Sequence, residues 1–383
     1  MKIVTFASKT LGDTIMATPL YRALRSMYPN EQIDLITEIE NHPVLKGVNL
    51  FDKEILFKEN IDFTDYDLAV MPVYCCQRIV PKLAQAAKRY VDFRHFYPKK
   101  PKSIWKRLSS AYAHMLFEKH QVELNIELLQ SLGYQGKIPD MYCPLPDREI
   151  YSQYKGKVGL CIYTPKNEFQ KGNNRFWPLE NWNKLGTFLG GENLIILGSD
   201  FDKPNMEKLA SLGNLPFQIT KNIGDFIGLC QQLKLLITTD HGAMHMAAVS
   251  GVPIISLHGA SSPVLLHPWV QGGGKSISVI SPKFCSPCQR SYRVGLCERE
   301  ITKMKCMSRI TPELIVKAVK VIESMREGES KILFSRKLLS PQEFKNNWKV
   351  KFRNLLNIIV SREIIRVIKL FTNRASALSK GKM

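Results

Sequence analysis

The sequence predicts an α/β protein with two doubly wound units, each built on a mostly parallel sheet. Short apolar runs alternate with stretches whose apolar residues recur every three or four positions, which are the patterns of buried strands and amphipathic helices. The alternation begins twice, with KIVTFAS at residues 2–8 and KVGLCIYT at residues 157–164. Strands that alternate with helices form parallel sheets covered on both faces. A chain of 383 residues is long enough for two such domains, at about 150 residues each.

The first half continues with one helix and two strands. LGDTIMATPLYRALRSM, residues 11–27, has apolar positions at helical spacing and predicts a helix that ends near Pro29. QIDLIT at 32–37 and DLAVMPVY at 67–74 predict strands.

The second half repeats the order of elements. Its predicted elements are a helix at 181–190, a strand at 193–199, a helix at 203–213, a strand at 233–240, a helix at 241–251, a strand at 252–259 and a closing helix at 310–325. In the closing helix, Thr311 suits the cap and Pro312 the first helical position.

The Pro- and Tyr-rich stretch 141–156 is the predicted linker. We therefore expect domains at residues 1–150 and 151–328, followed by a tail at 329–383. Open α/β sheets bind ligands beyond the carboxyl ends of their strands. The predicted site is thus a cleft between the domains, built from loops of both.

Composition excludes several classes of protein. With 44% hydrophobic and 23% charged residues, the chain is neither collagen-like, nor of low complexity, nor wholly disordered. No apolar run reaches about 18 residues, and the N-terminus lacks the apolar region of a signal peptide. We expect a cytoplasmic chain whose nine cysteines are mostly reduced.

The net charge of +20 is concentrated at the C-terminus. Residues 331–383 hold 13 Lys or Arg and 2 Asp or Glu, which gives +11. Such a segment predicts a polyanionic partner: nucleic acid, anionic lipid or a phosphorylated glycan. Trp348, Phe352 and Leu355 fall on one helical face, which is typical of a helix that lies on an anionic membrane. The alternative is a helix packed on the protein with its basic face in solvent.

Leu11-Gly12-Asp13 follows the first strand and opens a helix. Gly12 allows a ligand to approach the backbone closely, and Asp13 lies beside the positive end of the helix dipole. From spacing alone, Asp13 is either a general base or an ordinary helix cap.

The segment 239–245, TDHGAMH, leads from a strand into a helix and suits an anion. Gly242 would admit a phosphate, Asp240 could hold a hydroxyl, and His241 and His245 could donate to phosphate oxygens. The alternative is a capped helix with His245 facing the core. The segment matches neither GxGxxG nor GxxxxGK[ST], which disfavours a dinucleotide dehydrogenase and an NTPase.

Arg175 comes just before Trp177 and Pro178, where a helix begins. It can meet a phosphate there, or it can be an ordinary surface arginine. A separate group of four cysteines, Cys285, Cys288, Cys297 and Cys306, falls within 22 residues. Its first pair has a zinc-knuckle spacing, but the other spacings are irregular. Reduced thiols are therefore expected, with a structural zinc site as the alternative.

These motifs, in this order, resemble glycosyltransferase family 9, the lipopolysaccharide heptosyltransferases. The resemblance rests on LGDTIMATPLYRALRSMYP, RFWPLENWNKL, TTDHGAMHMAAVSGVPIISLHGASSP and CSPC…CMSRITPELIVKAV, with HQVELNIELLQSLG at 120–133 as a further match. It implies a GT-B fold, two Rossmann-like domains with the nucleotide-sugar bound mainly by the second. It also implies an inverting, metal-independent transfer of a heptose from an ADP-sugar to the inner core of lipopolysaccharide.

The resemblance also assigns residues. Asp13 matches the proposed base, and Gly12 lies beside it on the acceptor side. The donor-binding matches are Thr164, Arg175, Asp240, His241, Gly242 and His245. The basic residues Lys99, Lys100 and Lys102 would meet an acidic acceptor or the membrane. No cofactor is implied, because the ADP-sugar is a substrate. The expected partners are that donor, a lipid-anchored glycan and the inner face of the cytoplasmic membrane, with no nucleic acid.

The chain departs from the family pattern in three places. His241 stands where Thr or Ser is usual, Ser8-Lys9-Thr10 lacks the usual nearby Arg, and the tail exceeds the usual length. Other functions remain open: a nucleotide-sugar epimerase or hydrolase of the same fold, an inactive sugar-nucleotide binder, or a non-catalytic polyanion-binding protein.

Overall fold

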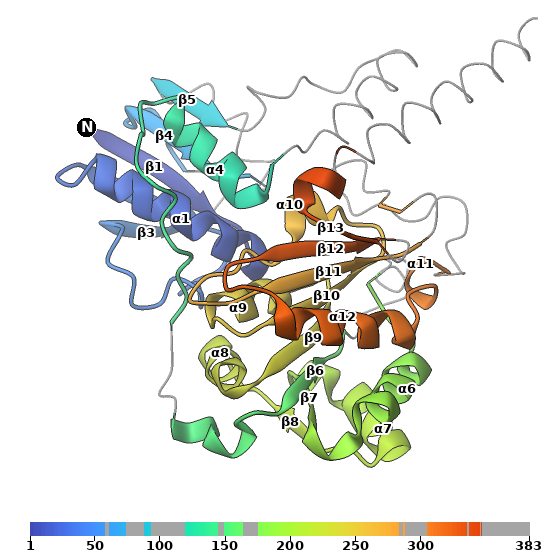
Figure 1. Cartoon of the computed structure of the whole chain (residues 1–383). Helices are drawn as coiled ribbons and strands as arrows, with labels where there is room; N and C mark the ends of the chain where they lie inside the picture. The colour runs from blue at the N-terminus through green and yellow to red at the C-terminus, as the bar shows by residue number, and fades with distance from the viewer. Residues whose placement is uncertain are drawn as a thin grey trace, which may run out of the picture.

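The computed structural model shows two α/β domains that pack against each other (Figure 1). It describes residues 1–57, 61–73, 88–92, 119–144, 149–163, 175–282, 286–287, 305–334, 337–344 and 346. Within this part of the chain, no helix is both long and apolar enough to cross a membrane.

In the described residues, the first domain is built on a five-stranded sheet whose neighbouring strands are all parallel. Its strands are β1 (Lys2–Ala7), β2 (Gln32–Thr37), β3 (Lys53–Leu56), β4 (Leu68–Met71) and β5 (Arg89–Asp92). The order is β3-β2-β1-β4-β5, so the chain changes direction across the sheet between β1 and β4. The loop after β1 therefore opens at the switch point, where open sheets bind ligands.

Helices α1 (Leu11–Met27) and α4 (Gln121–Gln130) cover one face of this sheet. Alternate residues of β1 face opposite ways: Ile3 and Ala7 pack in the core that includes both helices, while Val4 and Phe6 pack in a smaller core on the other face. The predicted helix at 11–27 and the strands at 32–37 and 67–74 are confirmed within a few residues. Strands β3 and β5 were not predicted.

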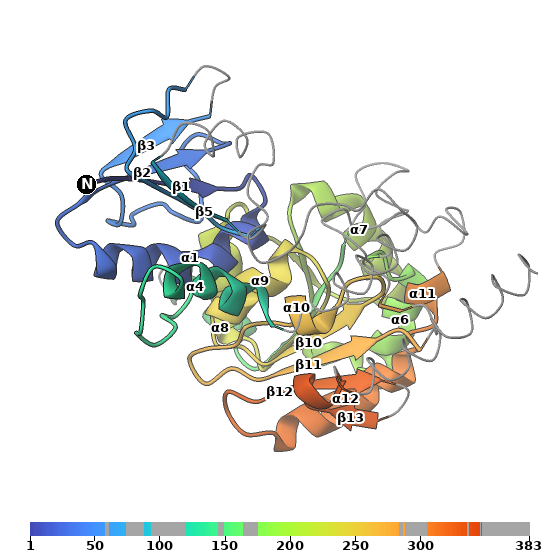
Figure 2. The same ribbon diagram turned by 90° about the horizontal axis from the view of Figure 1, so that it is seen from above.

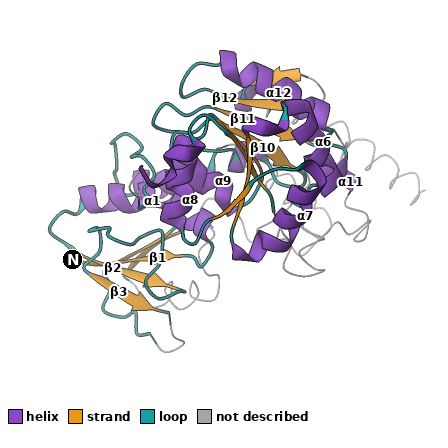
Figure 3. Ribbon diagram, turned by 90° about the horizontal axis from the view of Figure 1, so that it is seen from below, coloured by secondary structure: helices purple, strands orange, loops and turns teal. Residues whose placement is uncertain are grey.

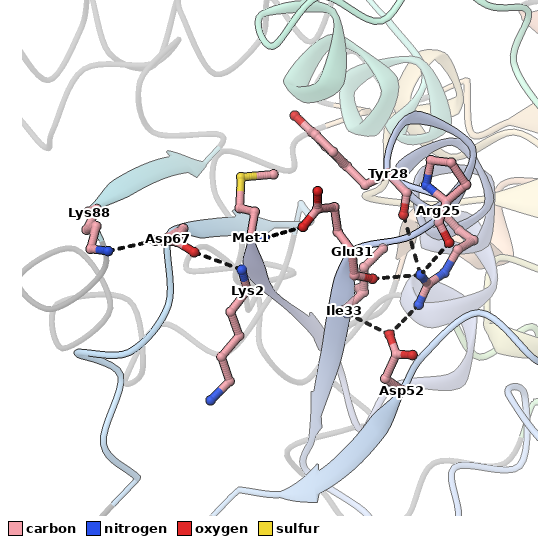
Figure 4. A network of polar contacts seen from close by, with 10 residues as sticks. Met1, Lys2, Arg25, Tyr28, Glu31, Ile33, Asp52, Asp67 and Lys88 are labelled. Atoms are coloured by element: carbon pink, nitrogen blue, oxygen red, sulfur yellow. Dashed lines mark hydrogen bonds and ion pairs between the residues drawn. The ribbon is translucent and has the colours of Figure 1, made fainter.

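A polar network fastens the C-terminal end of α1 to the sheet (Figure 4). The Arg25 guanidinium donates to the carbonyl oxygens of Tyr28 and Glu31 and to the Asp52 carboxylate, 2.6 Å away. The same carboxylate accepts from the backbone N–H of Ile33 at 2.8 Å. These bonds fix the far end of α1, and with it the direction in which the N-terminus of the helix points.

The second domain is built on a sheet of eight strands in the described part of the chain. They are β6 (Val158–Cys161), β7 (Leu194–Gly198), β8 (Phe217–Ile219), β9 (Leu235–Thr239), β10 (Ile254–His258), β11 (Ser276–Ile280), β12 (Ser330–Phe334) and β13 (Lys337–Leu339). All neighbours are parallel except β12 and β13. In the order β13-β12-β11-β10-β9-β6-β7-β8, the switch point lies between β6 and β9.

Helices lie on both faces of this sheet (Figure 3). Side chains of α8 (Ile223–Gln232) and α9 (Gly242–Val249) pack in the core shared with the first domain. The other face is covered by α6 (Leu179–Leu189), α7 (Lys203–Gly213) and α12 (Pro312–Ser324). The short helices are η2 (Glu149–Tyr154), η3 (Gly191–Asn193), η4 (Asp200–Asp202), α10 (Pro263–Leu266) and α11 (Lys305–Ser308).

The second half thus confirms every predicted helix and strand. Trp177 and Trp182 pack α6 onto the sheet: both are buried, and their rings meet edge to face with centroids 4.8 Å apart. The Trp177 Nε1–H also donates to the carbonyl oxygen of Ile310 at 2.8 Å. Strands β8, β11, β12 and β13 and helix α8 were not predicted.

The tail was predicted to begin at residue 329, and this boundary is wrong. Residues 330–334 form β12, which pairs in parallel with β11 in the second sheet. Farther along, Phe344 is buried and packs edge to face on Phe334, with centroids 5.6 Å apart. This segment was assigned to the tail because of its charge, but three consecutive apolar residues, Ile332, Leu333 and Phe334, are buried in the sheet. Residues 347–383 lie outside the described part of the chain.

The two domains share one continuous apolar core, in which α1 and α4 face α8 and α9 (Figure 2). The connecting segment is fixed where it crosses between them. The Gln271 side chain exchanges two hydrogen bonds with the backbone of Met141, at 2.8 and 2.9 Å, and the Tyr142 N–H donates to Thr18 Oγ1 at 2.8 Å. The relative placement of the domains is therefore set by packing and by specific backbone contacts.

Candidate active site

The N-termini of two helices, one from each domain, meet at the domain interface. A Cβ placed on Gly12 of α1 would lie 3.1 Å from His245 Cδ2 and 3.4 Å from the Cα of Gly242. A side chain at position 12 would press on the His245 ring, so glycine suits this close approach. The meeting point joins the loop after β1 to the loop after β9, the central loops of the two sheets. Two positive helix ends converge there, which favours a bound anion.

Asp13 lies in the first turn of α1 and is not the helix cap, because Thr10 holds the N-cap position. Its carboxylate accepts from two side chains: Thr10 Oγ1 donates to Oδ2, and Gln121 Nε2 donates to Oδ1 at 3.2 Å. Burial raises the pKa of Asp13 above its ordinary value, although these two hydrogen bonds and the Arg175 charge act in the opposite direction. A carboxylate with a raised pKa is a better proton acceptor at neutral pH, which suits a general base.

Asp240 and Arg175 form an ion pair in the second domain. Arg175 Nη2 lies 3.7 Å from Asp240 Oδ2, and the Asp240 side chain is almost fully buried while that of Arg175 is about a quarter exposed. Burial opposes ionisation of Asp240, but the Arg175 charge and the Ser261 hydroxyl outweigh it and hold its pKa below the ordinary value. The alternative of a surface arginine is therefore wrong.

A buried polar chain extends from Asp240 into the sheet. Ser261 bonds to Asp240 and lies 3.2 Å from His258 Nδ1, and His258 Nε2 lies 2.9 Å from the hydroxyl of Ser256. The chain ends at Ser278 on β11, 3.1 Å from Ser256. Both ring nitrogens of His258 are thus engaged and the residue is fully buried. This chain holds the loop that carries Asp240 in place.

His241 has a different role from the one predicted. It is the N-cap of α9: its Nδ1 accepts from the backbone N–H of Ala243 at 3.4 Å, and its Nε2 lies 3.1 Å from Thr238 Oγ1. Both ring nitrogens therefore have partners in the protein itself, one on β9 and one on α9. Its ring also lies against Tyr163, just after β6, with centroids 5.5 Å apart. His241 replaces the hydroxyl cap that Ser or Thr would supply there.

His245 faces the first domain. It is buried, and its Cδ2 lies against the backbone at Gly12. Burial lowers the pKa of His245 to about 4, so its imidazole is neutral at pH 7. A neutral imidazole carries one N–H donor and one acceptor nitrogen. It can therefore donate to a ligand oxygen without a charge of its own.

Buried side-chain atoms without a hydrogen-bond partner gather at this interface. Six such atoms occur among the described residues, and four of them are Gln121 Oε1, Arg175 Nε, Asp240 Oδ2 and His245 Nδ1. A buried polar group left without any partner costs about 1–3 kcal/mol, although Asp240 Oδ2 keeps the Arg175 guanidinium 3.7 Å away. Such a concentration is typical of a site whose partners arrive with the ligand.

Most of the other predicted residues lie outside the part of the chain that the structure describes. Thr164, Lys99, Lys100 and Lys102 lie outside the described residues, as do Cys285, Cys288 and Cys297. Cys306 lies on α11, half-buried against the core of the second domain. No group of His, Cys, Asp and Glu that could hold a metal ion occurs in the part of the chain that the structure describes. The zinc alternative therefore stays a prediction.

Four residues of the site were missed by the sequence reasoning: Thr10, Gln121, His258 and Ser261. Thr10 had a usable signal, because a threonine directly before a predicted helix is a cap candidate. His258 and Ser261 lie in the predicted strand–loop segment next to the Asp240 loop, where adjacent strands bring them together. Gln121 carried no signal, since one polar residue at the start of a helix is ordinary.

Because two histidines of the site are buried in their neutral form, we expect the free energy of unfolding to fall in mild acid. Burial lowers the pKa of both His245 and His258 to about 4, against about 6.5 in the unfolded chain. Between these values the unfolded chain binds more protons, so the free energy of unfolding decreases as the pH falls. From pH 7 to 5.5 we expect a loss of about 1 kcal/mol for each of the two, about 2 kcal/mol together.

Urea unfolding at several pH values measures this loss. His258→Gln is the matched variant, because an amide also donates and accepts but does not titrate in this range. It should reduce the slope of stability against pH by about one proton. A stability that stays constant or rises from pH 7 to 5.5 would show that these histidines are not held neutral in the folded protein.

Comparisons with known proteins give the family of the chain. The family model described as glycosyltransferase family 9 (heptosyltransferase) matches residues 92–294, more than half of the chain. Lipooligosaccharide heptosyltransferase 2 of Haemophilus influenzae is 23% identical over 313 residues, covering 70% of this chain and 86% of the relative. Lipopolysaccharide heptosyltransferase 2 of Escherichia coli is 24% identical over 310 residues, covering 70% and 85%.

Solved structures show the same fold. The glycosyl transferase family 9 protein of Veillonella parvula superposes with a TM-score of 0.57 at 17% identity, covering 84% of this chain and 96% of the other. ADP-heptose lps heptosyltransferase II of E. coli also gives a TM-score of 0.57 at 17% identity, covering 84% and 98%. The GT-B fold predicted from the sequence is confirmed, and the chain belongs to glycosyltransferase family 9, the heptosyltransferases.

Proposed function

We propose that this protein transfers a heptose, or a related sugar, from an ADP-sugar to the inner core of lipopolysaccharide, with inversion and without a metal ion. The observation that carries the proposal is the placement of Asp13. It is a half-buried carboxylate on the first domain, close enough to the Arg175–Asp240 pair of the second for both charges to influence its pKa. A base and an anion-binding pair on opposite sides of a domain interface suit a transfer between two substrates.

The base acts on the acceptor. In an inverting transfer, a hydroxyl of the acceptor attacks C1 of the donor sugar from the face opposite the leaving group and gives up its proton. Asp13 takes this proton, and its burial keeps the carboxylate basic enough to do so. Thr10 and Gln121 fix the direction of its oxygens. Because the attack is direct, no covalent sugar–enzyme intermediate forms.

The leaving group is a nucleoside diphosphate, which gains negative charge as the bond to C1 breaks. The Arg175 guanidinium and the converging N-termini of α1 and α9 offer positive charge at that place. His245 can add a neutral N–H donor. Asp240, already ionised and held by Ser261, can accept from a hydroxyl of the sugar. These residues supply the stabilisation that a metal ion gives in other transferases.

Replacing the base should abolish most of the turnover. Asp13→Asn keeps the shape of the side chain but cannot accept the proton, and a positioned base contributes about 10²–10⁴ in rate. We expect kcat to fall by at least about a hundredfold, with donor affinity nearly unchanged. The measurement is ADP release from ADP-heptose with a lipopolysaccharide-core acceptor and EDTA present. Asp65→Asn, an exposed position in the same domain, is the control. Activity of Asp13→Asn within a few-fold of wild type would refute the assignment of the base.

Binding of the donor phosphates should depend on Arg175. Loss of one charge-assisted contact costs about 1.5–3 kcal/mol, so Arg175→Ala should weaken ADP-sugar binding roughly ten- to a hundredfold. Arg175→Lys keeps the charge and should retain part of the affinity. Calorimetry measures both, with the exposed Arg309→Ala as control. If Arg175→Ala binds the donor as tightly as wild type does, the phosphates lie elsewhere.

The acceptor is lipid-anchored, and we propose that the basic tail holds the enzyme at the inner face of the cytoplasmic membrane. Residues 347–383 carry nine Lys or Arg and one Glu. Each basic residue near an anionic bilayer contributes about 1 kcal/mol, and salt screens the attraction.

The structure sets where the tail can be cut, because β12 and Phe344 belong to the fold. A chain truncated after Asn346 should fold, turn over a delipidated acceptor at nearly the wild-type rate and no longer sediment with anionic vesicles. Persistent binding to these vesicles at physiological salt would show that another surface is the anchor. Unfolding of the truncated chain would show that the tail is a packed element of the protein.

A further inference from the structure

Gln121 is buried at the first position of α4, beside the proposed base. Its side chain has no solvent exposure, although a glutamine is usually found at the surface. Gln121 Nε2 donates to Asp13 Oδ1 at 3.2 Å. It is thus one of two residues that fix the Asp13 carboxylate, and it comes from a different helix.

The chemistry of the contact decides which way the amide points. An ionised carboxylate only accepts hydrogen bonds, so the Gln121 nitrogen must face Asp13 and its oxygen must point away. That oxygen, Oε1, is buried and finds no partner among the described residues. By contrast, Asn125 on the same helix pairs both ends of its amide. Asn125 Oδ1 accepts from the Val73 N–H at 2.8 Å, and its Nδ2 donates to the Met16 carbonyl at 2.9 Å.

The position of Gln121 is set by the domain interface. Its neighbour His120 caps α4, with Nδ1 accepting from the Val122 N–H at 3.2 Å. The other ring nitrogen donates to the carbonyl oxygen of His267 in the second domain at 2.9 Å. The ring also stacks on Trp269, with centroids 4.9 Å apart. The start of α4 is therefore held by both domains, and so is the residue that holds Asp13.

We propose that Gln121 is a positioning residue for Asp13 and that its free amide oxygen accepts a hydrogen bond from a hydroxyl of the acceptor sugar. The inference rests on the proposed function, in which Asp13 is the base. The Gln121 nitrogen fixes the plane of the carboxylate, while Thr10 holds its other oxygen. The Gln121 oxygen belongs to the same amide group that contacts the Asp13 carboxylate, and an incoming hydroxyl would satisfy it.

Removing the amide should change the titration of Asp13. The groups around Asp13 are Thr10 on the loop after β1, Gln121 on α4, and Arg175 and Asp240 from the second domain. The Gln121 hydrogen bond favours the ionised form, so its loss should raise the pKa of Asp13, which burial already raises. A residue with a merely structural role would lower stability without moving this pKa.

The experiment compares Gln121→Met and Gln121→Asn with wild type. Met has a similar length but no amide, and Asn keeps an amide that is one methylene too short. Gln130→Met is the matched control, because it makes the same change at the exposed end of the same helix. The Asp13 carboxyl is titrated by NMR in protein labelled with ¹³C at the aspartate carboxyls, and Asp13→Asn identifies its signal. In parallel, kcat and KM are measured against pH with a delipidated acceptor.

In both Gln121 variants, the pKa of Asp13 should rise by at least about half a unit, and the acid limb of the kcat/KM profile should move with it. The KM for the acceptor should rise severalfold, while the affinity for the donor stays unchanged. An unmoved pKa and profile in correctly folded variants would overturn the positioning role. An unchanged acceptor KM would overturn the contact with the acceptor hydroxyl.

The NMR titration separates this inference from the proposed function. If the wild-type protein transfers no sugar but the Asp13 titration still moves in the Gln121 variants, the proposed function fails and the hold of Gln121 on Asp13 stands. If the wild-type protein is active and the titration does not move, the inference fails and the proposed function stands.

Discussion

The close approach of α1 and α9 at Gly12 is the constraint on which the site depends. A Cβ at Gly12 would lie 3.1 Å from the His245 ring, tighter than ordinary contact, so the absence of a side chain lets the two helix N-termini lie this close without displacing His245. The approach places the loop after β1 against the loop after β9. It thereby brings Asp13 of the first domain within electrostatic reach of Arg175 and Asp240 of the second. Neither domain alone could bring a base and an anion-binding pair together.

Burial at this interface acts in the same direction on the two carboxylates, but their partners differ. Both lose water, which favours the protonated form. For Asp240, the Arg175 charge and the Ser261 hydroxyl reverse the effect, so the group is firmly ionised. For Asp13, two hydrogen bonds and a more distant positive charge do not reverse it, so the pKa stays raised. Two acidic residues thus receive separate roles from their surroundings: Asp240 suits binding, and Asp13 suits proton transfer.

Much of this arrangement could be predicted from the sequence, because local patterns determine it. The two opening strands, the helix at 11–27 and the strand–loop–helix around Asp240 have clear periodicity, and their order implies where the loops meet. Residues that act through tertiary contacts carry no such pattern. Gln121 reaches Asp13 only because α4 packs beside α1, and His258 reaches Asp240 only through Ser261. His241 was predicted to meet the donor. Its role as a cap could not be predicted, because that role depends on contacts with Thr238 and with the turn that follows.

The central claim is that Asp13 takes a proton from an acceptor hydroxyl that attacks the donor sugar directly. The anomeric configuration of the product tests it most directly. NMR of the reaction of purified protein with ADP-heptose and a delipidated lipopolysaccharide-core acceptor gives the coupling of the new anomeric proton. A single direct displacement predicts a product whose configuration is inverted relative to the donor. A product that retains the donor configuration would contradict the account, because it requires a second displacement that Asp13 as a base does not provide.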